Sequence, residues 1–266
     1  MKLISRKEPY DWGYTDITTE GEQVRDTMMD FGILRLPQGK TESVVTEKEV
    51  AYLLMDGAAK FTFAGQTVRA QRTSLFHESC SCLHVPAGSS VEIVAESDLE
   101  LTVVATTNTK HFDPVFYSAA DVRSEKRGEG TMQETSTRIV RTIFDKTNTS
   151  KANLVLGEVV AHPGKWSSYP PHHHPQPEIY HYRFLPEQGF GVCVLDDGEV
   201  LKVEHQSTVK IVEDEVHPQS AAPGYAMYYV WAIRHLEGNP YTEPTFDPNH
   251  TWVENPDAEI FPNRRN

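Results

Sequence analysis

The sequence predicts an all-β protein built from two similar β-domains in tandem, and three observations support this prediction. Short apolar runs of strand length recur along the chain, turn residues separate them, and convincing amphipathic helices are hard to find. A chain of 266 residues is long enough for two ordinary domains, each with an apolar core. Short strands in this number are typical of β-sandwiches and β-barrels.

The first half of the sequence contains five runs that predict strands. Residues that favour turns bound these runs, for example at 37–39, Asp56–Gly57, Ala64–Gly65 and 86–88. The runs are Phe31–Leu36, Val50–Met55, Phe61–Phe63, Val91–Val94 and Leu99–Ala105.

The second half also contains short apolar runs separated by turn residues, and the two halves share a faint internal repeat. A strand, a turn rich in Pro and Gly, and a further strand follow one another both at 82–104 and at 209–230. We therefore predict an N-terminal β-domain over 1–115, a polar linker over 116–134, a second β-domain over 135–245 and a covering tail over 246–266. The strand-like runs are Asn153–Leu156, Glu178–Phe184, Phe190–Leu195, Thr208–Val212 and Tyr225–Ile233.

Composition excludes several classes of protein. The chain has 25 Lys and Arg against 38 Asp and Glu, a net charge of −13, which argues against a nucleic-acid partner. It has no run of 18 apolar residues and no export-type leader, so we expect neither a membrane partner nor secretion. Three cysteines without CxxC spacing indicate a reducing compartment. We therefore expect a cytoplasmic protein.

Histidine provides the most specific signal. In a strand, residues two apart point to the same face, so His172 and His174 share a face and His173 points away. Glu178 keeps that parity four residues after His174. Two imidazoles and a carboxylate make most of a metal site, and His217 is the candidate for the fourth ligand.

The ligand types leave the metal open among zinc, manganese, iron and nickel. Two simpler interpretations stand beside the metal site. Three successive histidines can form a surface turn, and a loop histidine such as His217 can simply bond to backbone. The HxH(x)3E spacing within a β-rich chain favours the metal site.

The same region carries a resemblance to known proteins. His172, His174 and Glu178, followed about forty residues later by His217, resemble the two-part metal motif of cupins. Over most of its length the chain is also similar to the 5-deoxy-glucuronate isomerases of bacterial inositol breakdown. The residues that carry this similarity are Arg127–Gly130, Val159, Trp166–His172, His174, Glu178, Tyr180, Arg183–Phe184, Pro186, Gln188–Phe190, His217–Pro218, Ala222–Tyr225 and Tyr228–Tyr229.

The resemblance implies a fold and an activity. The fold would be a bicupin, two jelly-roll barrels in tandem, with a metal-free N-terminal barrel and zinc in the C-terminal one. The activity would be an aldose–ketose isomerisation of 5-deoxy-glucuronate to 5-dehydro-2-deoxy-gluconate, and the partner a small sugar acid. The family also implies a homo-oligomer and a relationship to the 5-keto-4-deoxyuronate isomerases of pectin breakdown.

That reaction assigns expected roles to residues near the motif. A metal-stabilised enediolate requires a general base near the carbon-bound proton, and Glu178, Glu187 and Tyr229 are the candidates. The substrate carboxylate requires a cation, for which Lys165 and Arg183 are the nearest in sequence. The remaining candidates for sugar binding are Tyr169, Tyr180, Tyr182 and Gln188. Tyr180 and Tyr182 share the parity of the ligands, although plain core aromatics are the alternative.

Three further functions stay open at this point. One is another metal-cupin isomerase, of the 5-keto-4-deoxyuronate type, and the second is a cupin oxygenase using the same ligands. The third belongs to another class, a non-catalytic bicupin that binds a sugar.

Overall fold

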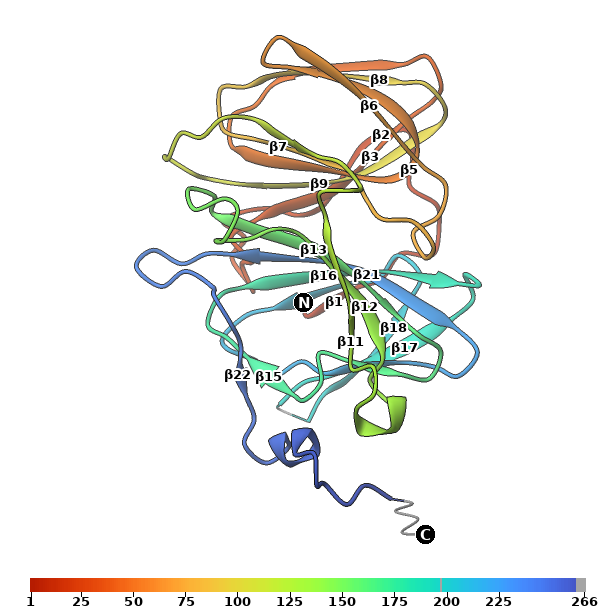
Figure 1. Ribbon diagram of the computed structural model, residues 1–266. Coiled ribbons are helices and arrows are strands. Elements are labelled where there is room, and N and C mark those ends of the chain that lie inside the picture. The colour runs from red at the N-terminus through yellow and green to blue at the C-terminus, as the bar shows by residue number, and fades with distance from the viewer. Residues whose placement is uncertain (197, 262–266) are drawn as a thin grey trace.

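The computed structural model describes residues 1–196 and 198–261 and contains two β-domains, one above the other in Figure 1. The predicted all-β class is confirmed, because the described residues contain only two short 3-10 turns, η1 (Met132–Glu134) and η2 (Thr251–Glu254), beside the strands. No helix in those residues is long and apolar enough to cross a membrane. The last five residues of the predicted tail, 262–266, lie outside the described part.

The upper domain is an antiparallel assembly of nine strands. One row of strands runs β10-β7-β5-β9-β3-β2, and β5 also pairs with β6 and β8, the latter pairing in turn with β4. The strands are β2 (Gly13–Thr18), β3 (Asp30–Leu36), β4 (Thr41–Val45), β5 (Glu49–Phe63), β6 (Gln66–Arg72), β7 (Cys82–Val85), β8 (Ser90–Ala95), β9 (Leu99–Thr106) and β10 (Val115–Tyr117).

The turn predicted at Asp56–Gly57 is wrong, because the two runs on either side of it form the single 15-residue strand β5. The register of β5 against β9 shifts between Leu54 and Asp56, which marks a bulge. Gly57 follows with a φ of +94°, and a Cβ there would lie 2.1 Å from the carbonyl oxygen of Asp98. The strand therefore bends at this point, and its two halves pair with different strands.

The lower domain contains two sheets that face each other. One has seven strands in the order β1-β19-β16-β21-β13-β12-β11, and the other has four strands in the order β14-β20-β17-β18. A small ladder of β15 and β22 lies at one end (Figure 1). The strands are β1 (Leu3–Ile4), β11 (Arg123–Arg127), β12 (Arg138–Phe144), β13 (Leu154–Ala161), β14 (Trp166–Ser167), β15 (His172–His173), β16 (Glu178–Leu185), β17 (Phe190–Val194), β18 (Val200–Glu204), β19 (Thr208–Ile211), β20 (Gln219–Ala221), β21 (Ala226–Arg234) and β22 (Thr245–Phe246).

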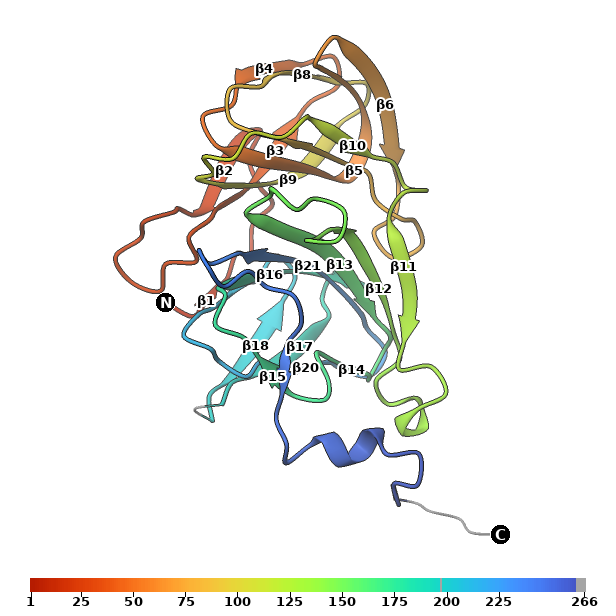
Figure 2. The same ribbon diagram turned by 60° about the vertical axis from the view of Figure 1, so that its left-hand side comes forward.

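Two strands from segments predicted to lie outside the second β-domain, β1 and β11, pair with strands of the lower domain. β1 pairs with β19, with Leu3 opposite Val209, although it lies in the range predicted for the N-terminal domain. β11 lies in the segment predicted as a linker and pairs with β12 (Figure 2). The boundaries at 115, 134 and 245 stay a prediction.

Buried apolar side chains form three clusters, one inside each domain and one between them. All eight residues of β13 are buried, because the strand serves two clusters at once. Leu156 and Val160 face the upper domain, whereas Val159 and Ala161 face the interior of the lower barrel. Because both faces of such a strand are buried, its sequence is a continuous apolar run and does not alternate between apolar and polar residues.

Candidate metal centre

The predicted ligands come from two separate segments of the lower domain. His172 opens the two-residue strand β15, His174 follows it, and Glu178 begins β16. His217 lies just before β20. His173 points away from this group, as parity predicts, and its Nδ1 lies 2.7 Å from Asp214 Oδ1.

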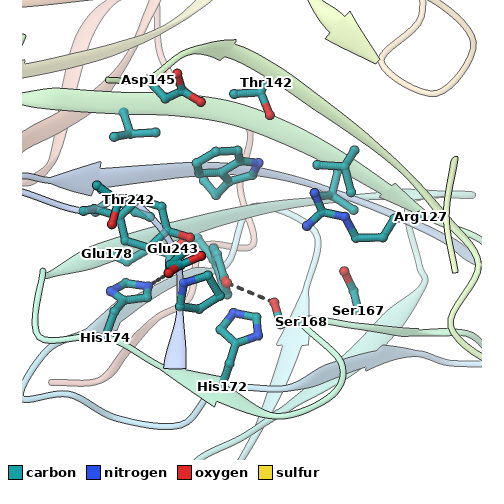
Figure 3. A pocket seen from close by; sticks show the side chains of 18 of the residues that line it. Arg127, Thr142, Asp145, Ser167, Ser168, His172, His174, Glu178, Thr242 and Glu243 are labelled. Carbon is teal, nitrogen blue, oxygen red and sulfur yellow. Dashed lines mark hydrogen bonds and ion pairs between the residues drawn. The ribbon is translucent and has the colours of Figure 1, made fainter. Parts of the chain in front are cut away.

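Three of the four predicted ligands form a tight, buried group. The ligand atoms of His174, Glu178 and His217 all lie within 4.8 Å of one another. His174 Nε2 is 3.1 Å from Glu178 Oε2, and His217 Nε2 is 3.3 Å from the same oxygen. Figure 3 shows the contact between His174 and Glu178 at the side of the cavity.

Backbone carbonyls orient the imidazole rings. The Nδ1 atom of each ring faces a carbonyl oxygen, which fixes the proton on Nδ1 and leaves the Nε2 lone pair for a ligand. The carbonyls belong to Pro170 at 3.2 Å for His172, Gln176 at 2.9 Å for His174 and Glu215 at 2.7 Å for His217. This pairing is the usual outer support of a histidine that binds metal.

His172 lies beside the group rather than within it. Its ring is edge-on to that of His217, with 5.1 Å between ring centroids, and it lines the same cavity. Burial, followed by the neighbouring His217, lowers the pKa of His172 to about 3. The ring is therefore neutral near pH 7, which is the form that binds a metal.

The electrostatics of the group fit a divalent cation. Burial would raise the pKa of Glu178, but the contacts with His174 and His217 outweigh burial and lower it to about 2. His217 Nε2 is buried and makes no hydrogen bond, although it faces a carboxylate oxygen. Lone pairs of nitrogen and oxygen thus converge on one point, where a positive charge is required. Two or three imidazoles with one carboxylate form a donor set that zinc accepts.

A cavity of about 380 Å³ opens above these residues. Two tyrosine hydroxyls in its wall are held by serines, Tyr229 Oη at 2.6 Å from Ser167 Oγ and Tyr180 Oη at 3.0 Å from Ser168 Oγ. Figure 3 shows both serines on the wall of this cavity. The C-terminal segment also contributes to the wall through Tyr241, whose ring centroid is 4.8 Å from that of His174.

The structure brings some of the predicted substrate residues to the cavity and places others elsewhere. Tyr180 and Tyr229 line it, whereas Tyr182 is buried in the adjacent core. Five predicted residues do not line it. Lys165 is half-buried, and Tyr169 lines a second cavity beside Trp252. Arg183 pairs with Glu100 of the upper domain at 2.7 Å, and Glu187 and Gln188 are exposed after β16.

Two arginines that the sequence reasoning missed do line the cavity, namely Arg127 and Arg138. Arg138 is 5% exposed and is the first residue of β12. Glu243, in the segment before β22, is a further carboxylate that it missed. The available signal for Arg138 was a charged residue at the start of an apolar strand, which on its own is also typical of a strand end.

Comparison with known proteins agrees with this geometry. The chain is 27% identical over 258 residues to the 5-deoxy-glucuronate isomerase of Bacillus subtilis subsp. natto, covering 90% of this chain and 91% of that protein. It is 31% identical over 186 residues to the protein of the same name from Geobacillus thermodenitrificans, covering 64% of this chain and 65% of that one. The second match therefore spans just under two thirds of the relative.

Solved structures share the fold. An IolB-like protein from Salmonella typhimurium LT2 superposes with a TM-score of 0.82 at 23% identity, covering 95% of this chain and 98% of that one. A cupin 2 conserved barrel domain protein from Leptotrichia buccalis gives a TM-score of 0.51 at 12% identity, covering 88% and 96%.

The fold is that of a bicupin, and its C-terminal barrel brings together two histidines and a glutamate, which are residue types that ligate metals. The particular family follows from the sequence match. Residues 4–253 match the KduI/IolB family, and the chain belongs to that family.

Proposed function

We propose that this protein is a metal-dependent aldose–ketose isomerase that converts 5-deoxy-glucuronate to 5-dehydro-2-deoxy-gluconate. The observation that carries the proposal is the group of His174, Glu178 and His217, of which His174 and Glu178 line the cavity, in a chain of the KduI/IolB family. The names of the curated relatives supply the substrate.

The isomerisation moves one proton between neighbouring carbons and one between their oxygens. A divalent ion held by the histidines and Glu178 would polarise those oxygens and stabilise negative charge on them. Burial raises the pKa values of Tyr180 and Tyr229, so both hydroxyls stay protonated. Because Ser168 and Ser167 hold these hydroxyls in place, they can hydrogen-bond the sugar oxygens.

A general base is needed to carry the carbon-bound proton, and Glu178, Glu187 and Tyr229 were the candidates from the sequence. Glu178 and Tyr229 line the cavity, but Glu187 does not. Tyr229 stays protonated, and Glu178 already contacts two imidazoles. Two further carboxylates line the cavity, Asp145 and Glu243. Asp145 already pairs with Arg123 at 2.5 Å, so we place the proton transfer between C1 and C2 on Glu243 or Glu178.

The setting of the enzyme is part of the same proposal. We propose zinc as the metal, because the donor set of nitrogen and carboxylate oxygen suits it. We propose the cytoplasm as its location, because Cys80, Cys82 and Cys193 are all free and buried. We also propose a homo-oligomer, as the family resemblance implies.

The test is conversion of 5-deoxy-glucuronate by the zinc-loaded protein in D2O, followed by NMR. A ketone carbon should appear together with solvent deuterium in the new hydroxymethyl group. The 5-keto-4-deoxyuronate substrate, run in parallel, identifies the alternative isomerase, and oxygen consumption with Fe(II) identifies an oxygenase. Zinc-loaded protein that forms no ketose from 5-deoxy-glucuronate would overturn the proposal.

A further inference from the structure

Strand β12 carries two buried arginines on opposite faces. Arg141 faces the upper domain, where its Nη1 donates to Glu158 Oε1 at 2.6 Å. Arg138, three residues earlier, lines the cavity of the lower barrel together with Val140 and Thr142. Because successive side chains of a strand point to opposite faces, the guanidinium of Arg141 lies at the domain interface and that of Arg138 lies at the cavity.

The partners of Arg138 are all uncharged. Its Nη1 donates to the carbonyl and to the hydroxyl oxygen of Ser136, both at 2.7 Å, and Nη2 lies 3.4 Å from the carbonyl of Tyr169. No carboxylate of the described residues lies within 4.0 Å of this guanidinium. These contacts hold the group at one edge and leave donors for another acceptor.

The other buried arginines each have a carboxylate partner, which Arg138 lacks among the described residues. Of the four arginines in the described residues that are buried, three pair with a carboxylate: Arg72 and Arg141 with Glu158, and Arg183 with Glu100. A buried cation without a counter-charge is costly, because it loses hydration without gaining an ion pair. Among the described residues, Arg138 is therefore the buried arginine that has no carboxylate partner, which leaves a ligand in the cavity as its counter-charge.

The cavity supplies the place for that partner. Arg138 lines the same space of about 380 Å³ as His172, His174 and Glu178, and Tyr180 and Tyr229 lie in its wall. Figure 3 shows Arg127, on the neighbouring strand β11, reaching toward the cavity on the side away from His174. Arg127 is exposed and already pairs with Glu125 at 2.5 Å, so it is a weaker candidate for the same role.

We propose that Arg138 forms a carboxylate subsite that binds the acid group of the substrate while the carbonyl end lies at His174, Glu178 and His217. The planar guanidinium accepts a carboxylate in a fork-like geometry that a neutral sugar cannot match. This inference rests on the proposed function for the identity of the sugar acid. It adds the residue that selects an acid over a neutral sugar.

Binding by calorimetry tests the subsite without relying on turnover. The zinc-loaded protein should bind D-glucuronate more tightly than D-glucose, and Arg138→Met should raise the dissociation constant for glucuronate at least about 30-fold. Its affinity for glucose should stay unchanged. Arg138→Lys, which keeps the charge and loses the fork, should fall between the two, and it remains informative where the methionine variant folds poorly. Arg69→Met is the control, because Arg69 is an exposed arginine of the upper domain that pairs with Glu96 outside the cavity, and it should bind like the parent protein.

Kinetics separate this inference from the proposed function. If 5-deoxy-glucuronate is turned over, Arg138→Met should raise KM by a similar factor while zinc content by elemental analysis stays constant. Folded, zinc-loaded Arg138→Met that keeps the parent affinity for glucuronate would overturn the subsite and leave the isomerase standing. Loss of acid selectivity in Arg138→Met, in a parent protein that does not isomerise 5-deoxy-glucuronate, would support the subsite and overturn the isomerase.

Discussion

Arg72 and Glu158 form a bidentate ion pair that is fully buried between the two domains. Arg72 Nη1 lies 3.0 Å from Glu158 Oε2, and Nη2 lies 2.7 Å from Oε1. Arg72 ends strand β6 of the upper domain, and Glu158 lies in the middle of β13 of the lower one. The Tyr228 hydroxyl donates to the same carboxylate at 2.7 Å, which leaves its oxygens fully occupied.

Breaking this pair should destabilise the whole molecule. Arg72→Met removes one cation and leaves Glu158 with Arg141 and Tyr228, whereas Glu158→Gln leaves two buried cations without a counter-charge. Removing one partner of a buried pair typically costs about 3–5 kcal/mol in the free energy of unfolding. Denaturant unfolding measures that loss, and Glu158→Gln should be the more damaging change. Equal stability of both variants and the parent would show that the pair contributes nothing.

Alanine in place of His174 should abolish tight metal binding while the fold persists. The loss removes a direct ligand, so the affinity should fall by more than the roughly 10–100-fold typical of outer-shell changes. Elemental analysis and a competing chelator measure it. His173→Ala is the matched control, because His173 points away and contacts Asp214. Metal stoichiometry that survives in both His172→Ala and His174→Ala would show that the site is assigned wrongly.

Glu215 should act on the metal centre through the loop that carries His217. Its carbonyl accepts from His217 Nδ1, while its carboxylate accepts from the backbone N–H of Val212 at 3.2 Å and pairs with Arg25. Glu215→Ala frees that loop and should weaken zinc affinity about 10-fold. Chelator competition against Glu213→Ala, an exposed glutamate of the same loop, provides the comparison. The same affinity in both variants would rule out this coupling.

Glu49 should make stability dependent on pH in the acid range. Burial would raise its pKa, but His84 at 2.9 Å and further donors, including the Asn153 backbone, outweigh burial and lower it. A lowered pKa in the folded state stabilises the fold above the unfolded value of about 4.3, and this contribution is lost as pH falls through the folded pKa.

The comparison is between the parent protein and Glu49→Gln in denaturant unfolding from pH 7 to pH 3. The stability difference should be constant above about pH 5 and should shrink below it. Glu47→Gln, at an exposed neighbouring position, should show no such change. A difference that stays constant down to pH 3 would contradict the assignment.

Short-range patterns predicted what depends on short-range geometry. The alternation of a strand was enough to separate His173 from His172 and His174, because the three residues are adjacent. It was not enough at Gly57, where a bulge bends one long strand and the sequence resembles a turn. Local sequence cannot distinguish these two uses of a glycine with positive φ.

The cation at the cavity could not be predicted in this way. Proximity in sequence favoured Lys165 and Arg183, but Arg138 reaches the cavity through the ladder that joins β12, β13 and β21. Arg183 instead crosses to Glu100, because its face of β16 packs on the upper domain. Which strand lies beside which is decided by long-range pairing, and the pattern within one strand does not contain it.

The double burial of β13 has a consequence for synthesis of the chain. Phe31 and Leu53 of the upper domain pack against Leu156 and Val160 of β13 in the cluster between the domains. While the ribosome is still making the strands of the lower domain, the upper domain exposes that apolar face to solvent. The newly synthesised upper domain should therefore bind holdase chaperones through this apolar face until the lower domain covers the face. A stop codon between the halves would yield an aggregating fragment rather than a free-standing module.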